Sequence, residues 1–305
     1  MLLQQMANSL GLPERVIQAF ANKANHAYKT YFIDKRGGGF REIHHPSKEL
    51  KALQRWLLHN VIMQWPVHSK AAAYRPNLGI ANNAQEHVHS RYLLRMDFQD
   101  FFPSITEHDV RTYLERSDGG TKRWDSTDLD LFVALVCRHG CLTIGAPTSP
   151  ALSNALCFEL DRQLDLAANA REVTYTRYAD DLFFSTTKTD ILKSVPEVVV
   201  SILATLDLPA ALLIRESKTR HSSKRGRRQV TGLVLRSDDV IGIGRKRKRY
   251  IRGLIHKFDL LSPSERRRLS GLLAFARSIE PDFINALIMK FGPERIGEAQ
   301  KMQQA

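Results

Sequence analysis

The stretch VTYTRYADDLFFS, residues 173–185, decides how the rest of the chain is interpreted. Its β-branched and aromatic residues predict two short strands that are joined at Ala179-Asp180-Asp181. Two adjacent carboxylates at the tip of an otherwise apolar hairpin repel each other and are costly to bury. A divalent cation would neutralise them, because carboxylate oxygens are preferred ligands of Mg²⁺.

A further carboxylate occurs on an apolar strand nearer the start of the chain. Residues 92–98, YLLRMDF, predict a buried strand with Asp97 close to its end. Asp97 and Asp180 are 83 positions apart (180 − 97), yet neighbouring antiparallel strands would bring all three acids together. An aromatic-x-Asp-Asp sequence alone is equally compatible with a polar turn that carries two solvated acids, so its interpretation depends on companion motifs.

The remaining pattern intermixes hairpins and helices. Residues 31–33 and 41–44 predict two strands around a glycine-rich turn, and Ser47 is the expected N-cap of the helix that follows. Apolar spacing predicts helices over 152–164 and 195–206 and from 245 onward, and a strand over 229–235. This mixture favours an α+β fold over a doubly wound parallel sheet.

The charge of the chain is concentrated in one segment. Lys and Arg outnumber Asp and Glu by 45 to 32, a formal net charge of +13. Between Arg215 and Lys257, fifteen basic residues accompany three acidic ones, a local excess of twelve. Such a segment is either a solvated basic face or a binding surface for a polyanion. No apolar stretch approaches the roughly 20 residues of a membrane span, which favours nucleic acid over a membrane.

The termini and cysteines favour a cytoplasmic protein. The first residues, MLLQQMANSLGLPERV, are too polar and too acidic for a signal peptide. The three cysteines, Cys137, Cys141 and Cys157, form no recognised zinc pattern and fit a reducing compartment. Cys137 and Cys141 are one helical turn apart, so we expect both to be buried on one helix.

Three segments in order resemble the palm motifs of reverse transcriptases: RMDFQDFFPSI (95–105), GAPTSP (145–150) and YADD (178–181). Lys218-Thr219 is similar to the lysine motif that follows them, and Val230-Thr231-Gly232-Leu233 to the primer-grip strand. Residues 83–87, NAQEH, resemble the Asn-Ala-x-x-His element of retron enzymes, and 230–232 their Val-Thr-Gly element. The resemblance runs from about residue 30 to residue 260.

The resemblance implies a right-hand polymerase. Its fingers would comprise residues 1–90 with 105–144, and its catalytic palm 91–104 with 145–235. Residues 236–305 would form a helical, basic thumb. No segment is left over for an RNase H domain, so removal of the RNA template would need a host RNase H.

By resemblance, Asp97, Asp180 and Asp181 are the ligands of two Mg²⁺ ions, together with the backbone carbonyl of Phe98. Two such ions activate the attacking hydroxyl and stabilise the leaving pyrophosphate oxygen. Lys218 would donate a proton to the departing pyrophosphate or steady it; a surface lysine is the alternative.

Other matched residues would bind the incoming nucleotide. Phe102 resembles the steric gate that excludes a ribose 2′-OH; its alternative is an ordinary core phenylalanine. Gly145 and Ala146 would let the backbone pass close to the nucleotide. Lys35 and Arg41 match the residues of the fingers that clamp the triphosphate, although an exposed basic hairpin is more often merely solvated. In place of the Gln that this family often has before Gly145, the chain has Ile144, so nucleotide binding would rely more on the triphosphate.

The retron elements and the thumb would bind RNA. His87 is equally compatible with a structural role. The basic helix from residue 245 can present one cationic face to the backbone of an A-form stem, with affinity that falls steeply with salt. The residues implied are Asn83, His87, Val230, Thr231, Gly232, Arg245, Lys248, Arg249 and Arg252.

The family resemblance also implies what the chain makes and with which partners. A retron enzyme copies part of a structured noncoding RNA into DNA from dNTPs. Synthesis starts from an RNA 2′-OH, and the complex usually serves antiphage defence with an effector protein. The alternatives are a reverse transcriptase of the group II intron or diversity-generating type, and a catalytically silent RNA-binding scaffold.

Overall fold

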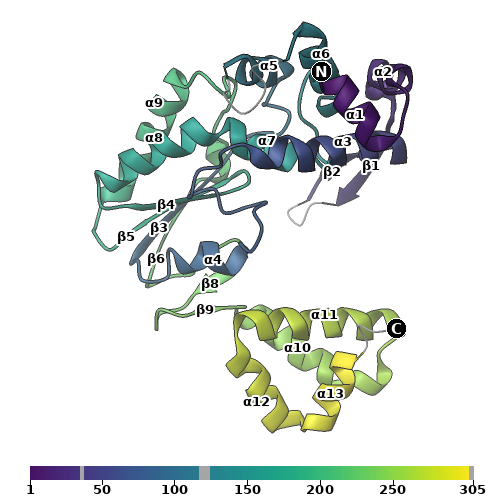
Figure 1. Ribbon diagram of the computed structural model, residues 1–305. Coiled ribbons are helices and arrows are strands. Elements are labelled where there is room, and N and C mark those ends of the chain that lie inside the picture. Colours follow the sequence, from purple (N-terminus) through teal and green to yellow (C-terminus); the bar gives the residue numbers. More distant parts are fainter. Residues whose placement is uncertain (35–37, 117–123, 302–305) are drawn as a thin grey trace. The chain divides into compact units, whose positions relative to one another are not determined.

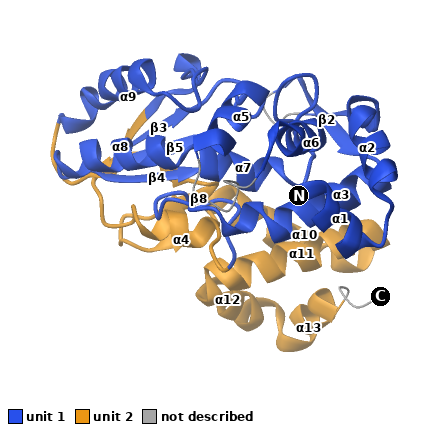
Figure 2. Cartoon of the chain, turned by 45° about the horizontal axis from the view of Figure 1, so that its top comes forward, with its two compact units in different colours: residues 1–76, 94–184, 190–220 blue, residues 77–93, 185–189, 221–305 orange. Residues whose placement is uncertain are grey.

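The computed structural model describes residues 1–34, 38–116 and 124–301. The chain divides into two compact units, drawn in different colours in Figure 2. Unit 1 comprises Met1–Pro76, Leu94–Phe184 and Asp190–Arg220. Unit 2 comprises Asn77–Leu93, Ser185–Thr189 and His221–Ala305.

A four-stranded sheet with the order β4-β5-β3-β6 positions the three acids of interest (Figure 1). Backbone hydrogen bonds from Phe98 N to Asp180 O and from Arg91 N to Thr186 O show that β3 and β5 run antiparallel, as predicted. Helices α7 and α8 cover one face of the sheet (Figure 1). The bounds are β3 Tyr92–Asp97, β4 Thr174–Tyr178, β5 Asp181–Thr186, β6 Arg220–Ser223, α7 Ser149–Leu156 and α8 Phe158–Asn169.

The strands form because their sequences are almost continuously apolar and buried. Leu94, Met96, Leu182 and Phe183 are each at most 1% exposed, as expected for a sheet in the interior. The predicted helix over 152–164 is instead two helices, α7 and α8, which are interrupted at Cys157. Apolar spacing continues through this break, so periodicity alone could not reveal it.

The rest of unit 1 consists of a hairpin and surrounding helices. Strands β1 and β2 pair antiparallel at the predicted positions. Ser47 caps α3 as predicted, because its hydroxyl accepts a hydrogen bond from the Leu50 N–H at 3.2 Å. The elements are α1 Leu2–Leu10, α2 Glu14–Asn22, β1 Tyr28–Asp34, β2 Phe40–Pro46, α3 Lys48–Asn60, α5 Glu107–Arg116, α6 Ser126–Val136 and α9 Val195–Thr205, with 3₁₀ turns at Ala24–His26, Ile62–Gln64, Ile191–Lys193 and Glu216–Lys218.

The cysteine prediction was wrong in two respects: Cys141 is only partly buried, and it does not lie on one helix with Cys137. Cys137 directly follows the last residue of α6. Cys141 lies after a turn and forms a β-bridge with Arg138, so the two cysteines do not share a helix. Gly140, with φ of 80°, allows the chain to reverse between them. All three cysteines are free thiols.

Unit 2 contains a small sheet, one short helix and a helical cluster. The predicted strand over 229–235 is a tight hairpin of β7 and β8, because Thr231 and Gly232 have φ values of 46° and 83° and reverse the chain. Helices α10 to α13 enclose a core that includes Ile251, Leu273 and Phe283. The bounds are α4 Ile80–Gln85, β7 Arg228–Val230, β8 Leu233–Leu235, β9 Ile241–Gly242, α10 Arg245–His256, α11 Pro263–Ile279, α12 Pro281–Phe291 and α13 Pro293–Lys301, with a 3₁₀ turn at Phe258–Leu260.

Helix α10 begins with five successive basic residues, 245–249, at the end where a helix carries partial positive charge. A cation there is unfavourable by roughly 0.3–1 kcal/mol, and like charges four residues apart add to the cost. No acidic residue occurs in its first turn, and Gly244 provides no side-chain cap. Within the described residues, no helix is long and apolar enough to cross a membrane.

Candidate active site

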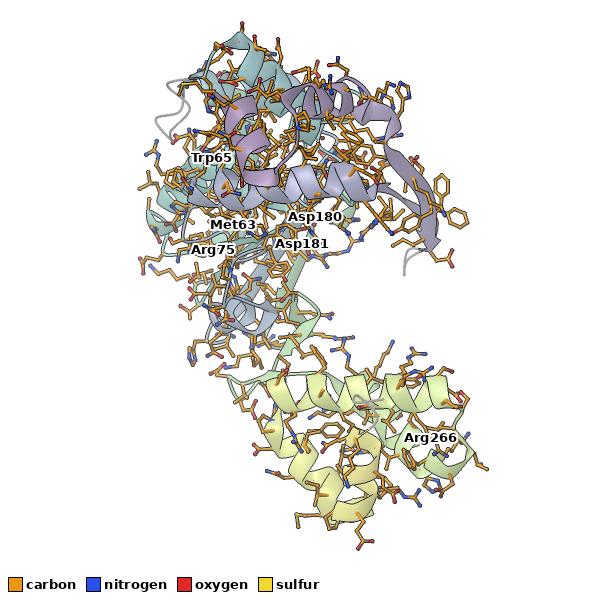
Figure 3. All side chains as sticks on the ribbon, turned by 45° about the vertical axis from the view of Figure 1, so that its right-hand side comes forward. Met63, Trp65, Arg75, Asp180, Asp181 and Arg266 are labelled. Carbon is orange, nitrogen blue, oxygen red and sulfur yellow. The ribbon has the colours of Figure 1, made fainter. Side chains whose placement is uncertain are left out.

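The turn between β4 and β5 presents Asp180 and Asp181, which are labelled in Figure 3. Ala179, just before them, has a φ of 58°, in the left-handed region that costs an L-residue about 1–2 kcal/mol. The Phe98 N–H donates to the Asp180 carbonyl oxygen at 2.9 Å, which ties this turn to the end of β3. The two acids are therefore held beside Asp97.

A fully buried ion pair fixes the same turn. Arg177 of β4 and Asp161 of α8 are both 0% exposed and are joined by hydrogen bonds of 2.6 and 2.8 Å. The Tyr175 hydroxyl also donates to Asp161, at 2.8 Å. The third guanidinium nitrogen of Arg177, Nη1, donates to the Ala179 carbonyl oxygen at 3.3 Å. This cation therefore connects α8 to the strained residue that precedes the two acids.

Asp97 is buried and faces two basic side chains. Lys218 Nζ donates to both of its carboxylate oxygens at 2.8 Å, and Arg215 Nε lies 3.9 Å from one of them. Lys218 is the last residue of the 3₁₀ turn Glu216–Lys218, and its side chain is about half exposed. The fold thus places Lys218 beside Asp97.

Asp181 has a basic partner that the sequence analysis did not foresee. Arg95, two residues before Asp97 on β3, donates from Nε and Nη2 to Asp181 at 2.8 to 3.0 Å. Pairing between the strands brings in this cation, which is distant in sequence from the hairpin. Burial raises the pKa of Asp181 to about 6, with Arg95 opposing and Asp180 and Asp97 adding to the rise.

The pKa of Asp180 is set by burial and by the charged residues around it. Burial raises the pKa of its carboxyl above the usual range, and the charge of Asp97 raises it further. Lys218 and Arg41 act in the opposite direction and are close enough to lower this pKa. The mutual influence of the three carboxylates shows that they share one electrostatic site.

The donor types at this site fit a divalent metal, because three coupled carboxylates are hard oxygen ligands. Their orientations are a different matter. Within the described residues, no group of three or more His, Cys, Asp and Glu side chains is arranged to hold a metal ion. The reason lies in the contacts above: Asp97 is directed at Lys218, and Asp181 at Arg95. Metal binding would require these two ion pairs to be exchanged for metal coordination.

Phe102 lies close to this site among aromatic side chains. Its ring centroid is 6.4 Å from Tyr74 and 5.5 Å from Phe101, and the side chain is only partly buried. Burial raises the pKa of Tyr74 to about 12, and the charge of Asp180 adds to the rise. A partly exposed ring that packs on a neighbour of Asp180 is compatible with the predicted steric gate.

The backbone conformation and the close neighbours at position 145 require glycine. Gly145 has a φ of 113°, and a Cβ built there would lie 2.5 Å from the carbonyl oxygen of His44 on β2. The adjacent Ile144 carbonyl accepts a hydrogen bond from the His44 N–H at 2.8 Å. The small residue therefore allows this loop to pair closely with β2, a reason that the sequence alone did not suggest. Ala146 follows it and is 3% exposed.

Comparison with known proteins decides the family. The sequence profile of reverse transcriptase (RNA-dependent DNA polymerase) matches residues 33–235. The retron Ec83 reverse transcriptase of Escherichia coli is 34% identical over 281 residues, which cover 90% of each chain. The retron Ec86 reverse transcriptase of the same species is 31% identical, over 98% of this chain and 93% of the relative. This chain belongs to the retron reverse transcriptases.

A relative from another genus and one solved structure agree with this assignment. The retron Mx162 reverse transcriptase of Myxococcus xanthus is 33% identical, over 91% of this chain and 64% of its own length. Among solved structures, apo telomerase from Candida tropicalis has a TM-score of 0.50 at 10% identity, covering 87% of this chain and 57% of that one. That likeness concerns the fold alone and agrees with the predicted α+β class. The enzyme is an RNA-directed DNA polymerase, as predicted, and its family relies on divalent metal.

The retron element 83–87 lies largely in the interior of this reverse transcriptase. His87 is 0% exposed, and its Nδ1 lies 2.7 Å from the Ser185 hydroxyl, contacts that agree with the structural alternative for this residue. Asn83 is 1% exposed, and its side-chain amide has no hydrogen-bond partner among the described residues. Thr231, in the β7–β8 turn, donates from its hydroxyl to the Ile80 carbonyl at 3.1 Å. Val230 is buried and Gly232 is exposed.

The four basic residues predicted on α10 differ in their contacts. Lys248 forms an ion pair with Glu280 and lies 5.3 Å from the centre of the Phe283 ring. Arg252 lies over the same ring at 5.1 Å. Arg245, Arg249 and Arg252 are exposed, and Lys248 is partly buried. Long cationic side chains can cover apolar surface with their stems, so α10 uses part of its charge to pack against α12.

Two predicted nucleotide contacts come from the β1–β2 hairpin. Lys35 lies outside the described residues. Arg41 pairs with Ile33 across the hairpin and is exposed, and it influences the pKa of both Asp180 and Tyr74. The fold therefore brings Arg41 within electrostatic reach of the acids, as its predicted role requires.

Arg177, Arg95 and Arg215 were missed by the sequence analysis. Arg177 was detectable, because a charged residue in the middle of a buried strand requires an ionic partner. Arg95 occupies the same face of β3 as Asp97, since alternate residues of a strand point to one side. Arg215, which also donates to Asp100 at 3.2 Å, is one of many basic residues in its segment and carried no such signal.

Proposed function

We propose that this enzyme copies part of a structured noncoding RNA into DNA, starting from a 2′-OH of that RNA, and so forms a branched RNA–DNA product (msDNA). The observation that supports this best is the meeting of Asp97, Asp180 and Asp181 in one electrostatic site beside Lys218. All three carboxylates are present, which disfavours a catalytically silent scaffold. Relatives similar over nearly the whole chain are named retron enzymes, which disfavours an intron or diversity-generating origin.

The metal ligands proposed are Asp97, Asp180 and Asp181 with the carbonyl of Phe98. Two bound Mg²⁺ ions would supply activation of the attacking hydroxyl and stabilisation of the leaving oxygen. The protein itself provides cations that can change partners. Lys218, half exposed, would leave Asp97 and steady or protonate the pyrophosphate, and Arg95 would release Asp181.

The dNTP would lie between the acids and the β1–β2 hairpin. Arg41 and Lys35 would bind the triphosphate, since guanidinium and ammonium groups suit phosphate oxygens. The Phe102 ring would exclude a 2′-OH by volume, and the backbone at Gly145 and Ala146 would approach the nucleotide. Support for Arg41 comes from its influence on Asp180.

The template RNA would be held by the retron elements and the helical part of unit 2. In this assignment, residues 1–90 with 105–144 are the fingers, 91–104 with 145–235 the palm and 236–305 the thumb. Arg245 and Arg249 are exposed for phosphate contacts, and Lys248 and Arg252 contribute charge while packing on Phe283. Asn83, His87 and the 230–232 turn would support the surface that meets the RNA.

Two protein partners complete the proposal. Host RNase H would remove the copied template, as the family resemblance implies. An effector protein would act with the RNA–DNA complex in antiphage defence. Both partners follow from the family, and the reaction itself would take place in the cytoplasm.

The product tests the proposal directly. The chain would be expressed together with its flanking genomic DNA, and extracted nucleic acid would be run on a denaturing gel with and without RNase and debranching enzyme. A short DNA band that shifts on debranching is expected. If dNTP incorporation on a primed RNA occurs without that band, the branched product is refuted while the polymerase stands.

The metal site has its own test. The double variant Asp180→Asn with Asp181→Asn should abolish DNA synthesis and leave RNA binding nearly unchanged, because only the oxygen ligands for the metal are altered. The matched control is Asp190→Asn with Asp207→Asn, two aspartates about 70% exposed, which removes the same charge. Normal extension by the first variant would contradict the assignment.

A further inference from the structure

Unit 2 contains a cavity of about 790 Å³ whose walls are mainly basic. The turn before β7 contributes Arg225 and Arg227, the segment after β8 contributes Arg236, and the start of α10 contributes Arg245 and Lys246. With Lys224 and Lys248, seven basic residues line it, against two acids, Asp238 and Glu280. The lining therefore carries a formal excess of five positive charges.

The floor of this pocket is a built ionic network. Glu280 is 6% exposed and accepts hydrogen bonds from Arg236 at 3.0 Å and from the Ile243 N–H at 3.2 Å. Lys248 also pairs with Glu280, and Arg236 reaches Asp238. One buried carboxylate thus holds two cations in place, and both pocket acids are already neutralised by them.

The remaining charge is not compensated. Arg225, Arg227, Arg245 and Lys246 are exposed, and among the residues that the structure describes none of them has an ion-pair partner. They come from two separate elements that meet here: Nη2 of Arg227 lies 3.7 Å from the position that a Cβ on Gly244 would take. A concave surface gathers four free cations at one place.

The local electrostatics indicate an anionic ligand. The first residues of helix α10 line this cavity, and the helix has no side-chain cap there, so helix charge and side-chain charge have the same sign. Proteins normally place acidic residues at a helix N-terminus. Departures from such local preferences are expected at functional sites. Phosphate groups relieve the conflict, because helix N-termini and arginines both bind phosphate.

We propose that this pocket binds closely spaced phosphate groups of a nucleic-acid strand, either its 5′-terminal triphosphate or successive backbone phosphates held in a bend. The inference rests on the proposed function in naming nucleic acid as the ligand. It adds a defined phosphate site at the start of α10 to the general basic surface of the thumb.

Binding of inorganic tripolyphosphate tests the pocket without catalysis. The full-length chain would be titrated calorimetrically in EDTA, as wild type and as Arg227→Gln with Lys246→Gln. The variant should bind at least tenfold more weakly, because it loses two of the four free cations. The control, Lys257→Gln with Arg267→Gln, removes two exposed cations of unit 2 outside the pocket and should stay within twofold of wild type.

Two further variants guard against loss of folding, which thermal melting would reveal. Arg227→Lys with Lys246→Arg keeps the charge and should restore most of the binding. Arg225→Gln with Lys246→Gln removes the same charge without touching Arg227 and should weaken binding to the same degree. Absence of tripolyphosphate binding by wild type, or equal losses in pocket and control variants, would overturn the proposal.

Short single-stranded RNAs of one sequence, with a 5′-triphosphate or a 5′-hydroxyl, distinguish the two sources of phosphate. If the pocket variant weakens binding of only the triphosphate form, the pocket holds the terminus. If both forms weaken equally, and the slope of log affinity against log salt falls by about 0.7 per lost contact, it holds backbone phosphates.

The outcome is separable from that of the proposed function. The Asp180→Asn, Asp181→Asn variant should bind tripolyphosphate like wild type. A chain that binds it but yields no branched DNA would refute the proposed function and keep the pocket. A chain that yields branched DNA without binding tripolyphosphate would refute the phosphate pocket and keep the proposed function.

Discussion

Replacing Arg177 with methionine should be among the most damaging single changes in this enzyme. The substitution leaves the Asp161 carboxylate fully buried without its cation, although the Tyr175 hydroxyl still donates to it. Removing one partner of a buried ion pair costs about 3–5 kcal/mol. Domains are commonly stable by only about 5–15 kcal/mol, so about a fifth or more of the total would be lost.

The reasoning is tested by a second substitution that removes the orphaned charge. Asp161→Asn is nearly isosteric and still accepts the Tyr175 hydroxyl. Combined with Arg177→Met, it should therefore restore about 2 kcal/mol or more of the loss. Urea unfolding followed by circular dichroism gives each free energy of unfolding. The control is Arg162→Met, which removes an exposed arginine of the same helix as Asp161 and should change little.

Activity should respond differently from stability. The double variant still lacks the donor to the Ala179 carbonyl, so the left-handed turn that presents Asp180 loses a restraint. Primer extension should stay at least several-fold below wild type even where unfolding has largely recovered. A loss of less than about 1 kcal/mol in Arg177→Met, or no recovery in the double variant, would refute the account of the buried pair.

Three other changes have defined outcomes. Gly145→Ala should lower the free energy of unfolding by about 2 kcal/mol or more, since its Cβ would meet the His44 carbonyl; a neutral effect in urea unfolding would contradict this. Because the pKa of Asp181 rises from 3.8 in the unfolded chain to about 6, its ionisation lowers stability as pH rises through that window. In EDTA, Asp181→Asn should thus be more stable than wild type by at most about 3 kcal/mol at pH 8 and by about half of that at pH 5, and a pH-independent difference would exclude the cause. Phe102→Ala should raise ribonucleotide incorporation relative to dNTPs by about tenfold or more, as measured by single-nucleotide extension; an unchanged ratio would return Phe102 to an ordinary packing role.

Much of the fold was predictable because its signals are local. The hairpin over 173–185, the strand that ends at Asp97 and the Ser47 cap all depend on residues within a few positions of one another. The order of the motifs also predicted the family. Errors arose where local pattern is ambiguous: the apolar spacing over 152–164 continues across a break, and the 229–235 strand contains a turn at Thr231-Gly232.

The candidate site was predictable only in part. Asp97, Asp180, Asp181 and Lys218 were named from motifs, and the fold brings them together. Arg95 was not foreseen as the partner of Asp181, because that contact joins two strands whose pairing is not written in either segment. The motifs name candidate site residues, whereas strand order determines which side chains neutralise them.

The basic segment shows this division most clearly. The sequence determined that fifteen Lys and Arg lie between residues 215 and 257, and it predicted a polyanionic partner for them. Only the tertiary structure decided that Arg228 is 1% exposed and donates to backbone carbonyls, that Lys248 pairs with Glu280, and that others remain free around a cavity. Charge is a property of composition, but its availability depends on burial and on partners brought from distant parts of the chain.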